Sequence, residues 1–221
     1  MTTGKITPSH NRRINKKSYW LSSTELMLDT YLNKPESVVE KESLKYDKIC
    51  SYIDELNPKS VLEIGCGFGY TLKKIHQRLP HLDIYGCDFA PNLVSQAKKY
   101  LKGTVSSKNI KVADVTQLSN YYGKQFDLIL THGCLMCLTT VQLYQALREI
   151  QSLAQNLIFI EADYSKYDFM NKLRFQKEKG YPINDYLSAL KALNFSIITI
   201  DNSLSAHDEI TNPTFFVCSS T

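Results

Sequence analysis

Hydrophobic residues from position 60 onward form short apolar runs of strand length that alternate with amphipathic segments. Runs of this kind predict β-strands buried in a sheet. There are seven of them, and the last two follow each other without a helical pattern in between. They are SVLEI at 60–64, DIYGCD at 83–88, IKVADV at 110–115, FDLILTH at 126–132, LIFIEAD at 157–163, SIITID at 196–201 and TFFVCSS at 214–220.

The intervening segments carry apolar residues at helical spacing, which predicts amphipathic helices. Alternation of strands and helices implies right-handed crossovers and a parallel sheet, with ligands bound beyond the carboxyl ends of its strands. The predicted fold is an α/β three-layer sandwich around a seven-stranded, mostly parallel sheet whose last two strands form an antiparallel edge hairpin. The helical groups are Leu72, Ile75 and Leu79; Leu93, Ala97 and Leu101; Leu143, Leu147, Ile150 and Ala154; and Ile183, Leu187, Leu190 and Asn194.

Two further helices are predicted ahead of this pattern. Ser22, three residues before Glu25, forms a capping box for a short helix, and a longer helix runs from Pro35 until Asn57 and Pro58 stop it. An organellar transit peptide is the alternative for the tail that precedes them, because its start is rich in Ser and Thr and lacks acids. The predicted organisation is a flexible basic tail over 1–18, an N-terminal helical lid over 19–57 and the main domain over 58–221.

Composition then narrows the class of protein. The 221 residues have a formal net charge of only +4, which does not by itself require a nucleic-acid partner. No apolar run approaches the roughly 18 residues of a membrane span, so a cytoplasmic protein without a membrane partner is expected. The six cysteines are scattered, which indicates reduced thiols. Cys134 and Cys137 have C-x-x-C spacing but are assigned to core packing, and no metal site is predicted.

The stretch VLEIGCGFG places three glycines between the first predicted strand and the helix that follows it. Glycines at 65, 67 and 69 allow a tight turn whose main chain can approach a ligand closely. A dinucleotide fingerprint would need a glycine where Tyr70 stands. Glu63, near the start of the turn, would repel a pyrophosphate but could neutralise an ammonium group. A ligand with a positively charged amino end is therefore indicated.

Two further acidic residues lie at the ends of the next strands. Asp88 ends the second strand, 19 residues after Gly69, where a carboxylate typically accepts hydrogen bonds from both hydroxyls of a ribose. Asp114 ends IKVAD, where its carboxylate and the next backbone N–H could bind the amino group and a ring nitrogen of adenine. An amino acid joined to adenosine satisfies all three acids.

These residues resemble the class I S-adenosylmethionine-dependent methyltransferases. VLEIGCGFG resembles their first motif, IYGCDFAPNLVSQAKKYL their second-strand acid and following helix, VADV their adenine-binding motif, and FDLILTHGCLMCL their fourth-strand motif. The resemblance covers residues 37–221 in element order and is densest between 60 and 140. It implies a Rossmann-like enzyme that uses S-adenosyl-L-methionine and releases S-adenosyl-L-homocysteine.

The resemblance also assigns residues to the cofactor. The glycine turn and its glutamate would hold the methionine part, the second-strand acid and its neighbour the ribose and adenine, and the third-strand acid and its neighbour the adenine edge. Backbone at the end of the fourth strand would bind the methionine amino group, and an N-terminal segment would fold over the cofactor as a lid. In that order, these residues are Glu63, Gly65, Cys66 and Gly67; Asp88 and Phe89; Asp114 and Val115; Thr131; and Tyr19.

Residues for the methyl acceptor are predicted at the same edge of the sheet. FDLILTHGCL lacks the N-P-P-Y or D-P-P-Y signature of enzymes that methylate exocyclic amines of nucleic acids, which disfavours that subtype. An oxygen acceptor would profit from a general base, and His132 is the candidate because imidazole has an ordinary pKa of about 6.5. A histidine satisfied by backbone is the alternative. Trp20, Glu161 and Tyr164 are predicted to line the acceptor pocket, with a hydrophobic anchor for the tail as the alternative role of Trp20.

The stretch at 165–180 bears on the class of acceptor. It carries five basic residues against two acids, interleaved with aromatics, which would suit RNA; a solvated amphipathic helix is the alternative. The predicted function is S-adenosylmethionine-dependent methylation of an oxygen or nitrogen atom of a small-molecule metabolite. An RNA or protein methyltransferase using the 165–180 insert and a non-catalytic S-adenosylmethionine-binding protein are the alternatives. Tyr70 and Glu63 oppose a nicotinamide oxidoreductase.

Overall fold

The computed structural model of the protein describes residues 36–162, 182, 184–204 and 213–220, with only the backbone given for 36–42 and 162. Several sequence predictions fall outside these residues. They concern the tail over 1–18, the part of the lid over 19–35, the insert at 165–180, and the site residues Tyr19, Trp20 and Tyr164.

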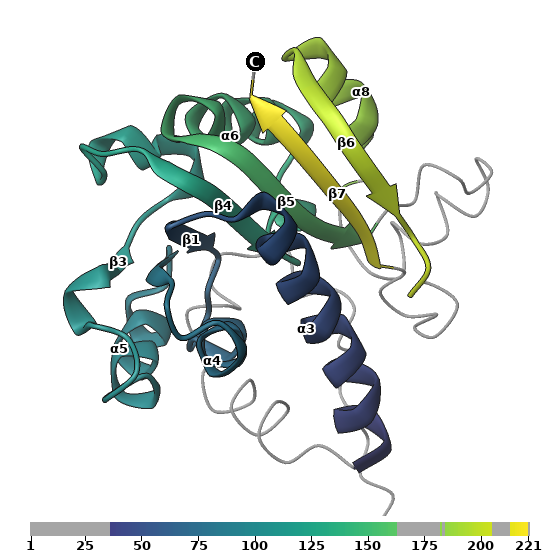
Figure 1. The fold of residues 1–221 in the computed structure, drawn as a ribbon. Helices are drawn as coiled ribbons and strands as arrows, with labels where there is room; N and C mark the ends of the chain where they lie inside the picture. Colours follow the sequence, from purple (N-terminus) through teal and green to yellow (C-terminus); the bar gives the residue numbers. More distant parts are fainter. Residues whose placement is uncertain (1–35, 163–181, 183, 205–212, 221) are drawn as a thin grey trace, which may run out of the picture.

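Seven strands form one sheet in the order β3-β2-β1-β4-β5-β7-β6 (Figure 1). Strands β1 to β5 are parallel to their neighbours, whereas β7 runs antiparallel to both β5 and β6. The predicted fold class, a mostly parallel sheet with an antiparallel hairpin at one edge, is confirmed. The strands are β1 (Ser60–Ile64), β2 (Asp83–Asp88), β3 (Ile110–Val112), β4 (Phe126–His132), β5 (Ala154–Ala162), β6 (Phe195–Asp201) and β7 (Pro213–Ser220).

Helices cover both faces of the sheet. In Figure 1, α3, α4 and α5 lie on one side of the strands and α6 and α8 on the other. The sheet separates two apolar cores because successive side chains of a strand point to opposite faces. Val61 joins the core under α3, α4 and α5, and its neighbour Leu62 joins the core under α6 and α8. The helices are α3 (Glu36–Leu56), α4 (Tyr70–Arg78), α5 (Pro91–Tyr100), α6 (Thr140–Leu153) and α8 (Tyr186–Ala192).

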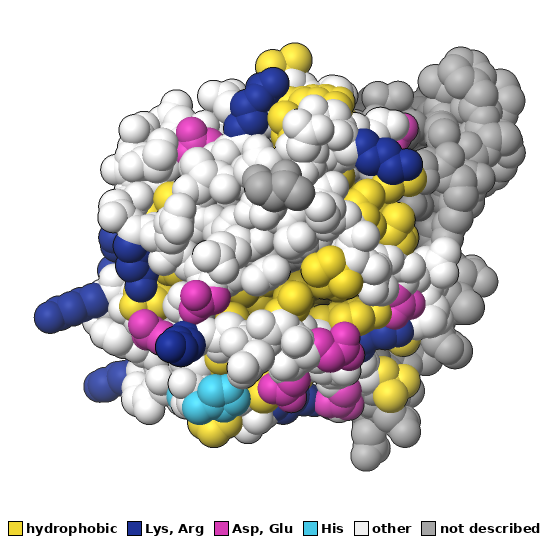
Figure 2. Space-filling model, turned by 45° about the horizontal axis from the view of Figure 1, so that its top comes forward, with side chains coloured by type: hydrophobic (Ala, Val, Ile, Leu, Met, Phe, Trp, Pro, Cys, Tyr) yellow, Lys and Arg dark blue, Asp and Glu magenta, His cyan; other side chains and the backbone are white. Residues whose placement is uncertain are grey.

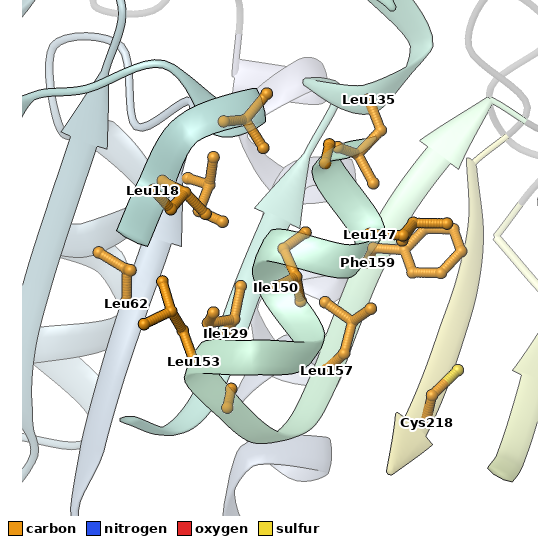
Figure 3. Close-up of a cluster of buried hydrophobic side chains, with 14 of the residues drawn as sticks. Leu62, Leu118, Ile129, Leu135, Leu147, Ile150, Leu153, Leu157, Phe159 and Cys218 are labelled. Atoms are coloured by element: carbon orange, nitrogen blue, oxygen red, sulfur yellow. The ribbon is translucent and has the colours of Figure 1, made fainter. Parts of the chain in front are cut away.

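The core on the α6 side packs helix α6 against the central strands β4 and β5. Leu147 and Ile150 of α6 lie over Ile129 and Leu157 of the two central strands (Figure 3). Helix α6 begins with a full capping box, in which the Thr139 side chain accepts the Gln142 N–H and the Gln142 side chain accepts from the Thr139 backbone. The capping box therefore fixes the end of the segment between β4 and α6 that joins the helix.

Two details of the predicted helices are wrong. Ala154 is not part of α6 but is the first residue of β5, where it pairs with Phe126 of β4. In α8 the buried side chains are Tyr186, Ala189 and Leu190, and Asn194 lies beyond the helix with a positive φ of 60°. Strand pairing decides the first case, and the Asp185 cap at the start of α8 sets the helix register in the second.

Helix α3 is tied to two other elements. The Tyr52 hydroxyl donates to Asp201 of β6 at 2.6 Å, and Lys48 forms an ion pair with the same carboxylate. Arg78 at the end of α4 pairs with Asp47 at 2.7 Å. These contacts hold α3 on the sheet face and against α4.

The surface is of mixed charge. Figure 2 shows a face on which Lys and Arg side chains lie among Asp and Glu side chains. The described residues on this face form no continuous basic surface of the kind that binds nucleic acid. Within the described ranges, no helix is long and apolar enough to cross a bilayer.

Candidate active site

The glycine turn joins the end of β1 to the start of α4. Gly65, Gly67 and Gly69 all have positive φ, at 72°, 55° and 89°, which residues with a Cβ adopt at a cost. A Cβ built at Gly65 would also lie 2.6 Å from the Sγ atom of Cys134. The turn is tied to β2 by a hydrogen bond of 2.9 Å from the Cys66 N–H to the carbonyl of Cys87. Backbone conformation and space therefore both demand glycine at position 65.

Asp88 lies at the end of β2, beside this turn, and is buried. Its Oδ2 accepts the Gly67 N–H at 3.0 Å and its Oδ1 accepts the Ala90 N–H at 2.9 Å. Burial raises the pKa of the carboxyl above its ordinary value, and these backbone hydrogen bonds act in the opposite direction. Each oxygen has a second lone pair, so the carboxylate can accept further hydrogen bonds from a ligand.

Glu63 is almost fully buried within β1, and it faces the same cavity. Its Oε2 atom has no hydrogen-bond partner among the described residues. Burial raises the pKa of the Glu63 carboxyl to about 8; the hydrogen bond from the Thr71 side chain lowers it, and the charge of Asp88 raises it. A buried carboxylate oxygen without a partner is costly, and a ligand cation at this point would remove that cost.

Thr71 connects Glu63 to His132. Its side chain, on the first turn of α4, hydrogen-bonds the Glu63 carboxyl, and its Oγ1 lies 3.5 Å from the Nδ1 atom of His132. His132 is the last residue of β4 and is half-buried at the cavity wall. The predicted general base is therefore linked through one hydroxyl to the buried glutamate.

The third predicted acid, Asp114, begins the short helix η3 (Val115–Asn120). Its Oδ1 accepts both the N–H and the hydroxyl of Thr116, at 3.0 and 2.8 Å. Asp114 is half-buried and Val115 is buried, and both line the cavity, as does the half-buried ring of Phe89. The carboxyl ends of β2 and β3 thus form one wall of the cavity.

Thr131 and Glu161 lie on the neighbouring strands β4 and β5 and contact each other. Thr131 is completely buried in the sheet and does not line the cavity, unlike every other predicted cofactor residue that the structure describes. Its hydroxyl donates to Glu161 at 3.2 Å. Glu161 does line the cavity, but backbone N–H groups of the loop after β4 occupy its carboxylate.

All these elements surround one cavity of about 480 Å³ at the carboxyl ends of the parallel strands, within the range of small-molecule sites. The described residues contain no cluster that could hold a metal ion. Cys134 and Cys137, which were assigned to the core, are only half-buried and line this cavity. Wall residues that the sequence prediction missed include Lys45, Phe68, Tyr70, Thr71, Met136, Leu138, Ile160 and Pro213.

Some of these residues carried a usable signal. Tyr70 and Thr71 directly follow the glycine turn, so the sequence could have placed the first turn of the next helix beside the ligand site. Lys45 gives no such signal, because it lies on α3, and only the packing of that helix brings it to the cavity.

Residues 61–171 match the methyltransferase domain family. The chain belongs to this family. A malonyl-[acyl-carrier protein] O-methyltransferase of Anoxybacillus flavithermus is 32% identical over 82 residues, which are 37% of this chain and 30% of that protein. A tRNA N(3)-methylcytidine methyltransferase of Schizosaccharomyces pombe is 25% identical over 166 residues, which are 65% of this chain and 67% of that protein. The matched parts thus span under a third and about two thirds of these two relatives.

Solved structures confirm the methyltransferase fold. Magnesium protoporphyrin IX methyltransferase (ChlM) from Synechocystis PCC 6803 with bound SAM has a TM-score of 0.69 at 15% identity, covering 92% of this chain and 94% of that one. The plantazolicin methyltransferase BpumL in complex with SAH has a TM-score of 0.63 at 15% identity, covering 92% and 93%. The family and fold predicted from the sequence are both confirmed.

The position of Asp88 in this methyltransferase domain leads to a first testable prediction. Asp88→Ala should weaken binding of S-adenosylhomocysteine by about 1–3 kcal/mol, because hydrogen bonds to a charged acceptor are lost. Calorimetric titration measures this directly. Asp83→Ala, at the exposed opposite end of the same strand, should leave the affinity unchanged. Equal affinities for the Asp88 variant and the unaltered protein would show that the ribose assignment is wrong.

Proposed function

We propose that the protein is an S-adenosylmethionine-dependent methyltransferase that methylates an oxygen or nitrogen atom of a small molecule. The observation that carries this proposal is the Oε2 atom of Glu63, buried beside the glycine turn and without a partner among the described residues. An ammonium group is the complement that such an oxygen needs. In S-adenosylmethionine that group belongs to the methionine half.

The other predicted cofactor residues fit the same ligand. Gly65, Cys66 and Gly67 would hold the methionine part, Asp88 and Phe89 the ribose and adenine, and Asp114 and Val115 the adenine edge. All seven line the cavity. When bound, the cofactor supplies a methyl group already activated on a sulfonium, so the protein's task is to align the acceptor and exclude water.

The acceptor would occupy the part of the cavity beyond the cofactor residues. Thr71 and His132 line one side of this part, and Met136, Ile160 and Pro213 provide apolar surface. His132 would take the proton of an oxygen acceptor as the new bond to carbon forms. A nitrogen acceptor that is already neutral needs no such base.

A small acceptor is favoured over a macromolecule by the size of the cavity and by the nature of several relatives. The solved neighbours include methyltransferases of magnesium protoporphyrin IX and of plantazolicin, by their titles. A tRNA acceptor is the second candidate, because the tRNA N(3)-methylcytidine methyltransferase matches 65% of this chain. The basic insert at 165–180 that would serve RNA lies outside the described residues.

One experiment separates these candidates. The protein is incubated with S-adenosylmethionine labelled on the methyl group and, in turn, with a cell extract freed of macromolecules, with total tRNA and with total protein. We expect label to enter the small-molecule fraction, and S-adenosylhomocysteine to inhibit its transfer. Label in tRNA or protein instead would overturn the small-molecule proposal.

Binding measurements complete the comparison. S-adenosylhomocysteine should bind, and NAD should not. Binding of S-adenosylhomocysteine without transfer to any fraction would favour a non-catalytic cofactor-binding protein. Binding of NAD alone would overturn the proposal entirely.

A further inference from the structure

The carboxylate of Glu161 binds the loop that follows β4. Its Oε1 accepts the N–H groups of Cys134 and Leu135 at 3.1 and 2.9 Å, together with the Thr131 hydroxyl. Its Oε2 accepts the Met136 N–H at 2.9 Å. Glu161 is only 1% exposed, so these contacts replace the water that an ionised carboxylate would otherwise require.

Three successive backbone N–H groups that converge on one carboxylate form a concave anion site within the protein itself. The preceding N–H, that of Gly133, donates to the carbonyl of Ile160 at 2.9 Å. Residues 160 and 161 of β5 therefore satisfy all the N–H groups from 133 to 136. Three donors therefore already occupy Oε1, which leaves only Oε2, with its single donor, for the direct acceptor contact predicted from the sequence.

The loop at 133–138 lines the cavity with every residue except Leu135. At one end Cys134 packs against Gly65 of the glycine turn, close enough that a Cβ there would meet its sulfur. Farther along the loop, Met136, Cys137 and Leu138 line the cavity wall. The conformation of this loop thus sets both the space beside the cofactor residues and the shape of the acceptor side.

We propose that Glu161 is a positioning residue for methyl transfer, which holds the loop at 133–138 in the conformation that shapes the acceptor side of the cavity. This inference rests on the proposed function for its effect on catalysis, but not for its effect on the loop. Glu161 acts through the backbone of residues 134–136 and through the Met136 side chain that they carry into the wall. Burial raises the pKa of Glu161 to about 7, and the bonds from Leu135, Met136 and Cys134 oppose this.

The first test is Glu161→Gln, which keeps the shape of the side chain. A carboxamide can still accept from Cys134 and Leu135, but its NH₂ group is a donor and would face the Met136 N–H. Hydrogen exchange in peptides spanning 133–138 should become faster by about tenfold or more, because local opening is easier once a charged hydrogen bond is lost. In the labelled-methyl assay, we expect the half-saturating amount of the small-molecule extract to rise about fivefold or more, with a smaller change in maximal rate.

Asp127→Asn is the matched control. Asp127 also accepts two backbone N–H groups and a hydroxyl, from Lys59 and Ser60, but at the opposite end of β4. This variant should lose thermal stability and should leave both the exchange of the 133–138 loop and the half-saturating amount unchanged. A role of Glu161 in general stability alone would make the two variants behave alike, and that result would overturn the proposal.

A second variant keeps the test decisive if Glu161→Gln fails to fold. Thr131→Val removes one hydroxyl donor to Glu161 while the three backbone donors remain. It should raise exchange of the loop by a few-fold at most, because the backbone bonds that hold residues 134–136 are kept. Loop amides that exchange at the unaltered rate in Glu161→Gln would contradict the proposal. If that variant does not fold, loop amides that exchange about tenfold or more faster in Thr131→Val would contradict it, because the three backbone bonds would then not be what holds the loop.

The exchange and activity readouts separate this inference from the proposed function. If the unaltered protein transfers no methyl group and binds no S-adenosylhomocysteine, the proposed function fails. Exchange of the 133–138 loop still decides in that case whether Glu161 holds it.

Discussion

Replacing His132 by alanine is expected to slow methyl transfer to an oxygen acceptor about a hundredfold or more, with S-adenosylhomocysteine still bound at nearly unchanged affinity. The reason is that His132 lines the cavity and is the general base proposed for an oxygen acceptor. Initial rates with labelled S-adenosylmethionine, measured beside calorimetric titration with S-adenosylhomocysteine, separate the two effects.

The control for this prediction is His81→Ala, an exposed histidine that does not line the cavity, and it should keep full activity. Thr71→Val tests the link to Glu63. A Thr71 hydroxyl that donates to Glu63 accepts from the Nδ1–H of His132, which leaves Nε2 as the nitrogen able to take a proton. Full activity of His132→Ala would mean that alignment alone accelerates the transfer or that the acceptor is a neutral amine.

Glu63→Gln is expected to weaken S-adenosylhomocysteine binding about tenfold to a hundredfold, the equivalent of one charged hydrogen bond. The buried Oε2 atom of Glu63 is the proposed partner of the ammonium group, and a neutral amide cannot balance that charge. Calorimetric titration at pH 8 measures the loss. Glu55→Gln, on α3 and outside the cavity, is the matched control and should bind as the unaltered protein does.

The pH dependence of binding adds an independent readout of Glu63. Its carboxyl has a pKa raised to about 8 in the free protein, so it is mostly protonated at pH 7. Pairing with an ammonium favours the ionised form, so binding below pH 8 releases a proton. Affinity should therefore rise between pH 6 and 8, by at most about tenfold per pH unit, and level off above pH 8. Glu63→Gln should remove this rise, and a flat profile in the unaltered protein would contradict the assignment.

The sequence alone predicted the elements of the main domain, because each element has its own local pattern of apolar and polar residues. Strand-length apolar runs located all seven strands, and the glycines at 65, 67 and 69 marked a turn that the structure confirms by three positive φ angles. The ends of the strands are harder to predict, because they depend on pairing with a neighbouring strand. IKVADV reads as one strand to residue 115, but the pairing with β2 ends at Val112, and Asp114 instead caps a helix.

The candidate site was predictable in part. Glu63, Asp88, Asp114 and His132 all lie at or near the ends of predicted parallel strands, and such ends meet at one edge of the sheet. Their meeting around one cavity follows from that topology. Glu161 was predicted to line the acceptor pocket and does line the cavity, but its backbone partners lie 25 to 27 residues earlier in the chain and could not be read from the sequence.

The sequence by itself determined the order of strands and helices, the glycine turn and the family. Burial of one face requires apolar residues at a regular spacing, and positive φ angles favour glycine, so both features can be read from residues that are close together in the sequence. Tertiary structure alone decided which groups hydrogen-bond one another in the site. The contact between Thr71 and His132 spans 61 residues, and the bonds from the 134–136 backbone to Glu161 depend on β4 lying beside β5. Such pairings arise only when strands distant in the chain come together, and no local pattern of residues records them.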